Sequence, residues 1–377
     1  MVISFCFSSS EGDVPVDNLT LDRPFILEPF RDHPFMTLRD YFLAIQRFIL
    51  RDSGRSLTSL LGRLWDREVE LGDIDNLILR YEKYGTLYQI ASVTVSALEN
   101  RVRLTVSTAI SVQAKTTLDR ESDLLHQLNG TTSVPYLPQT YWKQTMTVQK
   151  EEGTETLLMS LSQWFEGYHE WHFSRDDEGK ERIIIWDMGG GYRFASEYEA
   201  YEIIRQASRI LTLYYDTETH RRISPWHHSA GDFVVKAGGD GVDVKLVTAR
   251  GYEPIVLSDE KAGPSQALLL FLLETTVKMR LDKHEGMGES IWAEASLLDA
   301  VLEGFFQAVR TKEYEPREGA IKVDEFIFFL KLVSEDEIRK VLLTRLDKYD
   351  LLDSSDYALF SRHLDDHARD VYRALLG

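Results

Sequence analysis

The chain has 377 residues, of which 43% are hydrophobic and 28% charged, so it can build a substantial core and does not have the composition of a disordered chain. Its formal net charge of −18 disfavours general binding to nucleic acids or to anionic lipid surfaces, but it leaves room for a local basic pocket. The single cysteine, Cys6, excludes a disulfide within the chain and a multi-cysteine metal site, which is typical of a reducing compartment.

The N-terminal residues are apolar but do not resemble a signal peptide, because no basic segment precedes them and Glu11 and Asp13 follow soon after. The longest apolar run, residues 267–273, is too short to span a membrane. We therefore expect a cytoplasmic protein whose partners are a small molecule or another protein, with no nucleic acid and no membrane among them.

The first part of the chain predicts an arm followed by helices. Prolines punctuate residues 1–35, which we expect to form an irregular N-terminal arm. Apolar residues then recur at helical spacing over residues 37–49, with Thr37 as the N-cap. A second helix is predicted over residues 57–64.

The next part predicts a strand-rich region with one embedded helix. Alternating apolar residues bounded by turn signals indicate strands, and the first three suggest an antiparallel meander. These strands are predicted over residues 77–81, 88–95, 102–109, 145–149 and 156–164. The embedded helix is predicted over residues 118–128, with its leucines on one face.

The second half predicts a loop and a hairpin surrounded by helices. Extended segments are expected over 168–173 and 183–186, with a break at the glycines 189–191. The loop covers residues 225–232, and the strands 233–235 and 242–247 form a hairpin around a glycine turn. Helices are predicted over residues 197–215, 264–281, 291–311, 321–332, 335–348 and 355–375.

This order predicts an α+β protein of four parts. Residues 1–75 would form the N-terminal arm and helices, and residues 76–165 a strand-rich lobe. Residues 166–316 would form a second, mainly helical lobe that carries the loop and the hairpin. Residues 317–377 would add a C-terminal helical extension.

The order of elements over roughly residues 75–310 resembles the bilobal protein-kinase-like fold, closer to its aminoglycoside- and choline-phosphotransferase branch than to ordinary protein kinases. The resemblance implies an antiparallel-sheet N-lobe, a mainly helical C-lobe, and helical extensions at both ends of the chain. It also implies ATP and magnesium as cofactors. In this family a loop of the form H-R-D-L-x-x-x-N or H-G-D-x-x-x-x-N runs into a short apolar strand, and a hairpin brings up the metal-binding Asp of D-F-G.

The apolar strand 233–235 fixes the most natural register of this family's loop on the chain. It puts Asp232 at the metal-binding Asn position and His227 at the catalytic Asp position. Thr248 then occupies the position of the second metal-binding Asp, where a neutral hydroxyl is a poorer magnesium ligand than a carboxylate. Sliding the register to use Gly231-Asp232 as the G-D pair loses two other residues of the motif.

The strand-rich lobe retains few of the residues that the resemblance requires. Gly85 is the one glycine where a phosphate-covering loop should offer several, and residues 102–112 contain no lysine to pair with the phosphates. Glu121 corresponds to the helix glutamate whose lysine partner is missing, and Glu166 lies in the segment that corresponds to the adenine-contacting connector.

These replacements favour a catalytically impaired relative of the family. Such a protein would act in regulation by binding a ligand, which could be a nucleotide, or by binding another protein. The alternatives are an active ATP-dependent phosphotransferase of small molecules that uses Asp232 with other partners, and a structural or interaction protein that uses its helical C-terminal third.

Histidine pairs offer further candidate sites. His227 and His228, with Asp232 as the orienting group and Ser229 nearby, suggest a hydrolase, but no G-x-S-x-G motif is present. We interpret both as loop histidines whose rings are satisfied by neighbouring backbone groups.

Two other histidine pairs lie close enough in the sequence to share a metal ion in principle. The three-residue spacing of His169 and His172 sends their side chains to opposite faces of a strand, which disfavours a shared metal. His363 and His367 share a helix face, but without an H-E-x-x-H motif we expect that face to be exposed. The glycines 189–191 lack the spacing of a phosphate-binding loop and suggest a flexible connector.

Overall fold

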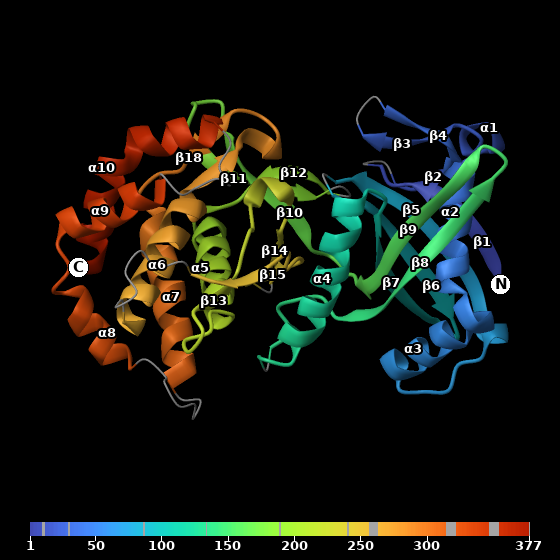
Figure 1. Ribbon diagram of the computed structural model, residues 1–377, viewed down its shortest axis with the longest axis horizontal. Coiled ribbons are helices and arrows are strands. Elements are labelled where there is room, and N and C mark those ends of the chain that lie inside the picture. The colour runs from blue at the N-terminus through green and yellow to red at the C-terminus, as the bar shows by residue number, and fades with distance from the viewer. Residues whose placement is uncertain are drawn as a thin grey trace. The chain divides into compact units, whose positions relative to one another are not determined.

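The computed structural model describes residues 1–9, 12–28, 31–85, 87–132, 134–187, 190–239, 241–255, 263–313, 322–346 and 354–376. Over these residues it is a mixed α/β protein with mainly antiparallel sheets (Figure 1), which confirms the α+β class in its coarse form. The chain divides into two compact units, one of Met1–Gln127 with Pro138–Glu166 and one of Leu128–Leu137 with Gly167–Gly377. Within the part of the chain that the structure describes, no helix is long and apolar enough to cross a membrane.

The first unit is built on a seven-stranded sheet in the order β2-β1-β5-β6-β7-β9-β8. Its strands are β1 (Val2–Phe7), β2 (Val14–Pro15), β5 (Ile74–Tyr84), β6 (Gln89–Ala97), β7 (Asn100–Ala109), β8 (Thr140–Lys150) and β9 (Gly153–Gln163). Strands β5, β6 and β7 form the predicted antiparallel meander, and β9 returns beside β7. Strand β1 is parallel to β5, and the other pairs are antiparallel.

The prediction of an irregular arm over residues 1–35 is wrong. Strand β1 lies inside the sheet, and β3 (Pro24–Glu28) pairs with β4 (Arg31–Thr37) after the short helix α1 (Asn18–Leu21). Alternation along β1 turns Phe5 toward the core, where its ring stacks on that of Phe42 with centroids 4.8 Å apart. The prolines fit this arrangement because Pro15 lies in an edge strand and Pro24 begins β3, positions that tolerate proline.

Helices α2 (Leu38–Ile49), α3 (Arg55–Trp65) and α4 (Val112–Asn129) complete the first unit. Thr37 is the N-cap of α2, as predicted, and forms a reciprocal capping box with Asp40. The apolar stripe of α2 supplies the largest rings of the core, among them the fully buried Tyr41 and Phe42. Helix α4 begins at Val112, before the predicted start at residue 118.

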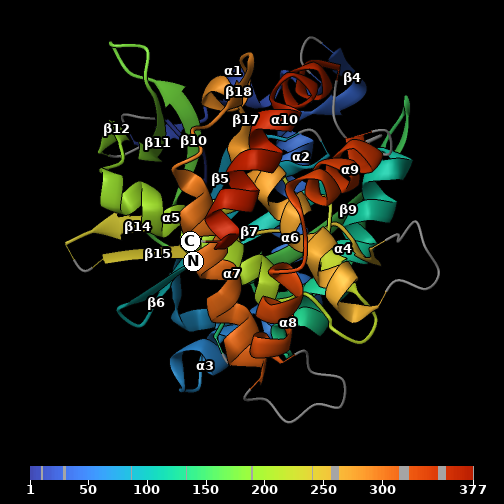
Figure 2. The ribbon, with the colours of Figure 1, turned by 90° about the vertical axis from the view of Figure 1, so that its left-hand side faces the viewer.

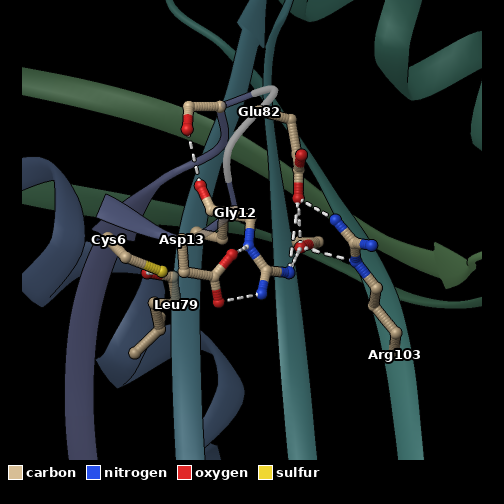
Figure 3. A network of polar contacts seen from close by, with 9 residues as sticks. Cys6, Gly12, Asp13, Leu79, Glu82 and Arg103 are labelled. Atoms are coloured by element: carbon tan, nitrogen blue, oxygen red, sulfur yellow. Dashed lines mark hydrogen bonds and ion pairs between the residues drawn. The ribbon is translucent and has the colours of Figure 1, made fainter. Parts of the chain in front are cut away.

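A charged network crosses the sheet beside the start of β2 (Figure 3). The buried Arg80 donates from Nε to Asp13 Oδ1 over 2.6 Å and from Nη1 to the hydroxyl of Ser92 over 3.3 Å. Arg103 donates to the same hydroxyl over 3.0 Å and forms an ion pair with Glu82. The hydrogen bond from Arg80 is the main reason why the pKa of Asp13 is lowered. This network ties β2 to the central strands through paired charges.

The thiol of Cys6 lies beside this network and is not poised for reaction. It donates to the carbonyl of Leu79 over 3.8 Å (Figure 3), and burial, with the Asp13 carboxylate next, raises its pKa to about 11. The thiol is therefore protonated at neutral pH and packs as a small apolar group.

The second unit contains a five-stranded antiparallel sheet in the order β12-β11-β10-β14-β15. Its strands are β10 (His169–Arg175), β11 (Glu181–Asp187), β12 (Gly191–Phe194), β14 (Phe233–Gly238) and β15 (Gly241–Leu246). Two short ribbons pair β13 (Arg221–Ile223) with β16 (Tyr252–Pro254) and β17 (Leu281–Lys283) with β18 (Ser290–Trp292). The predicted hairpin is thus present, with Asp240 of its turn outside the described residues.

Helices form most of the rest of the second unit, where α5, α6 and α7 pack side by side (Figures 1 and 2). They are α5 (Glu197–Leu213), α6 (Pro264–Arg280), α7 (Leu297–Glu313), α8 (Val323–Leu330), α9 (Glu335–Leu346) and α10 (Ser354–Leu376). Ser196 is the N-cap of α5, and Pro264 is the first residue of α6. Both residue types are common at these helix positions. Predicted residues 291–292 belong instead to β18, and residues 189, 321 and 347–348 lie outside the described residues.

Candidate functional site

The predicted loop lies in the second unit and joins β13 to β14 through a short 3-10 turn, His228–Ala230. Gly231 ends this turn with a φ of 65°, a conformation that side chains rarely adopt. A Cβ at this position would lie 2.6 Å from Cδ of Glu170 on the neighbouring β10. Glycine is therefore favoured here, mainly by the positive φ, and its missing side chain leaves room for the Glu170 carboxylate.

Asp232 is buried, with 1% of its surface exposed, and its carboxylate accepts three hydrogen bonds from described residues. Arg250 donates from Nη2 to Oδ1 over 2.6 Å and from Nη1 to Oδ2 over 2.7 Å, a bidentate arrangement. The backbone N–H of His227 also donates to Oδ2 over 2.8 Å. Asp232 therefore holds the start of the loop and the segment after β15 together.

The backbone strengthens the same connection. The carbonyl of Asp232 accepts from the N–H of Val247 over 2.8 Å, and the buried Thr248 is the next residue. The structure thus brings His227, Asp232 and the Thr248–Arg250 segment into one place, although they come from two sides of the hairpin.

His227 and the buried Lys278 of α6 both interact electrostatically with this carboxylate. Burial, followed by the positive charge of Lys278, lowers the pKa of His227, so its imidazole is neutral at pH 7. Burial also lowers the pKa of Lys278 to about 8, against the opposing effect of Glu274. The Lys278 ammonium lies 5.3 Å from the ring centroid of Trp226, which is cation–π distance.

His228 differs from the prediction that neighbouring backbone groups satisfy its ring. It is fully buried, and both ring nitrogens lack a hydrogen-bond partner among the described residues. Aromatic rings surround it, the nearest being Trp171 at 4.5 Å and Trp226 at 5.4 Å between centroids. Burial lowers its pKa to about 4, so the imidazole is neutral and acts as a packing group.

The other histidine pairs are also built into the fold. His172 is buried with its Nδ1 3.7 Å from Oδ2 of Asp282; burial alone would lower its pKa, but the Asp282 and Glu170 carboxylates raise it. The prediction that His363 and His367 share an exposed face is wrong, because His367 is fully buried and contacts two residues of α6. The described residues contain no cluster of histidine, cysteine and carboxylate side chains that could hold a metal ion.

Three predicted cofactor-binding residues belong to the first unit. Gly85 follows β5 and donates its N–H to the carbonyl of Tyr88 over 2.9 Å, and Thr86 lies outside the described residues. Glu121 is buried on α4, next to Ser122, whose hydroxyl donates to Ser160 on β9 over 2.9 Å. Glu166 is exposed at the end of the unit.

Sequence reasoning missed Arg250 and Lys278, the two cations of the site. For Arg250 the sequence offered one clue, its position two residues after Thr248. Lys278 carried a clearer signal, because it lies four residues after Glu274 on a helix whose other residues are mostly apolar.

Comparison with known proteins adds no family to this geometry: no protein-family model matches the chain, and no curated protein matches it.

Proposed function

We propose that the chain is a degenerate relative of the protein-kinase-like phosphotransferases, one that binds a ligand or a protein partner instead of transferring phosphate. The order of elements supports the relationship. In the first unit the meander β5–β7 is followed by α4 and by the hairpin of β8 and β9. In the second unit α5 precedes the loop, which leads into the hairpin of β14 and β15. These are the features that the resemblance implies.

The ion pair between Asp232 and Arg250 carries the proposal that catalysis is impaired. In the proposed register Asp232 would be a magnesium ligand, yet both of its carboxylate oxygens already accept hydrogen bonds from a guanidinium. Arginine keeps its charge at all accessible pH values, so a divalent cation at this carboxylate would meet a fixed positive charge. The neutral hydroxyl of Thr248 stands at the second metal position, where the family has a carboxylate.

One observation favours an active phosphotransferase as the second candidate. His227 would occupy the position of the proton-accepting Asp, and its lowered pKa leaves it neutral and able to accept a proton at pH 7. A proton acceptor without a metal to neutralise the phosphates supplies only part of the reaction, so we rank this candidate second.

The test compares the full chain with Asp232→Asn and Arg250→Gln in two assays: transfer of the ATP γ-phosphate and the melting temperature with ATP, each with and without magnesium. We expect no magnesium-dependent transfer in any of the three proteins. Ligand at a hundredfold excess over its Kd stabilises a protein by about 2.7 kcal/mol, so binding would be visible as a rise in Tm. Arg250→Gln alone should gain a Tm rise with magnesium, because it frees the carboxylate. Magnesium-dependent transfer by the unmodified chain that Asp232→Asn abolishes would overturn the proposal in favour of the second candidate.

A further inference from the structure

A polar cavity lies between α5 and α7 in the second unit, in a part of the fold that the proposed function does not use. Its volume is about 380 Å³, within the range of small-molecule sites. Arg205 and Arg209 line it from α5, Gln307, Arg310 and Thr311 line it from α7, and Tyr136 also contributes to its wall. Spacings of three and four residues on each helix place these side chains on the facing surfaces.

Close packing of the two helices fixes the walls of this cavity. A Cβ at Gly304 of α7 would lie 2.0 Å from the carbonyl oxygen of Arg205, so only glycine permits the observed approach. Beyond this contact the Arg205 guanidinium donates to Gln307 across the two helices. The side chain of Gln206 is held as well, donating to the carbonyl of Val242 over 2.7 Å. The walls are therefore set before a ligand arrives.

The charges of the cavity are incompletely balanced. Glu202 pairs with Arg205 over 2.6 Å, which accounts for one of the three guanidinium groups. Arg209 donates to the hydroxyl of Tyr136, a neutral acceptor, and Arg310 makes no hydrogen bond or ion pair with any described residue. No carboxylate is present among the described residues that line the cavity. In a chain of net charge −18, Arg209 and Arg310 thus bring two positive charges to the cavity without a carboxylate partner among the described residues.

A smaller cavity of about 90 Å³ adjoins the first and shares Tyr136, Arg209 and Thr311 with it. It adds the ammonium of Lys312, which donates to the carbonyl of Tyr215 over 2.8 Å, and the side chain of Asp216. The Asp216 carboxylate accepts two backbone hydrogen bonds of 2.9 and 2.8 Å. The second cavity therefore adds hydroxyl groups and the charged side chains of Asp216 and Lys312 to the arginines of the first.

We propose that these joined cavities bind a small phosphate ester that also carries hydroxyl groups, such as a sugar phosphate. Guanidinium groups match the geometry of phosphate oxygens, and Arg209 and Arg310 are the two without a carboxylate partner. The Tyr136 and Thr311 hydroxyls and the Gln307 amide suit the hydroxyl-bearing part. The proposal does not depend on the fold family proposed above, because the groups assigned to the ligand are side chains of α5 and α7 and Tyr136.

The experiment measures binding to the full chain by calorimetry at constant ionic strength with three probes: glucose 6-phosphate, inorganic phosphate and glucose. We expect glucose 6-phosphate to bind, inorganic phosphate to bind more weakly, and glucose not to bind. Hydrogen bonds to charged groups contribute enough that Arg310→Gln and Arg209→Gln should each weaken binding by about 10- to 100-fold. Arg310→Gln is the sharper variant, because this exposed side chain has no described contact whose loss would disturb folding.

Arg362→Gln is the matched control, since it removes the same charge from an exposed position on α10. It should bind glucose 6-phosphate as the unmodified chain does. Absence of binding at millimolar ligand, or equal losses in Arg310→Gln and Arg362→Gln, would overturn the site. Inorganic phosphate that binds as tightly as the ester would overturn the assignment to an organic phosphate. None of these outcomes involves ATP or magnesium, so they are distinct from failure of the proposed function.

Discussion

Replacing Arg250 by alanine tests whether the ion pair holds the candidate site together. The variant leaves the buried Asp232 carboxylate with the His227 N–H as the only remaining side-chain hydrogen bond described for it. Removing one partner of a buried pair costs about 3–5 kcal/mol. Because 20% of the Arg250 side chain is exposed, water can replace part of the guanidinium, and we expect the lower end, about 3 kcal/mol.

Hydrogen exchange read by mass spectrometry gives a local measure of this effect. The amides of His227 and Val247 both bond to Asp232, so their protection should fall with the loss of Arg250. Adding Asp232→Asn to Arg250→Ala removes the unpaired charge and should restore part of the stability, a coupling that a mutant cycle detects.

An exposed pair provides the control for the Arg250 variant. Arg339 and Asp365 are 2.6 Å apart, but their side chains are 44% and 65% exposed, so Arg339→Ala should cost less than about 1 kcal/mol. If Arg250→Ala costs no more than Arg339→Ala in urea unfolding, the reasoning about Asp232 is wrong.

Three further variants test the packing of the second unit. Gly231→Ala should lose about 1 kcal/mol, mainly because of the positive φ, since the Glu170 carboxylate can move aside; equal stability to Gly238→Ala, which has open space, would contradict this. Gly304→Ala should lower Tm and weaken glucose 6-phosphate binding together, because it separates α5 from α7; an unchanged Tm would refute the close contact. His228 has a native pKa of about 4, below its unfolded value near 6.5, so stability should fall by about 1.4 kcal/mol per pH unit as pH decreases between those values. His228→Phe should reduce this dependence of the unfolding free energy on pH, measured by urea unfolding at several pH values. An unchanged dependence would show that other groups cause it.

Elements with a strong local period could be predicted from the sequence. The apolar stripe of α5 and the alternation along β5, β6 and β7 each lie within one segment, and the structure confirms them. Strand β1 was missed because its partner β5 begins at residue 74, and a short apolar segment does not reveal which distant strand it will join. Prolines also suggested an irregular arm, although two of them occupy strand positions that need no N–H donor.

A buried histidine of α10 shows the same limit for side chains. His367 was expected on an exposed face because its pairing with His363 matches no metal-binding motif, yet its two ring nitrogens meet Thr276 and Arg280 of α6 at 3.1 and 3.0 Å. Those partners lie about ninety residues away in the chain, so helical spacing alone could not supply them. Polar side chains can be buried when residues distant in the sequence supply their hydrogen-bond partners. A local sequence pattern shows the side chain but not those partners.

The position of Arg250 gives the proposed loss of phosphoryl transfer a physical cause. If Asp232 once shared a divalent cation with a second carboxylate, replacing that carboxylate by Thr248 would weaken binding of the cation. The buried Asp232 carboxylate would then have no positive charge to balance it. An unpaired buried carboxylate costs several kcal/mol, so a nearby permanent cation would then stabilise the fold. Arg250 is such a cation and lies two residues beyond Thr248. On this argument Asp232 serves to hold the His227 loop to the end of β15, and a carboxylate introduced at residue 248 would not create metal binding while Arg250 remains.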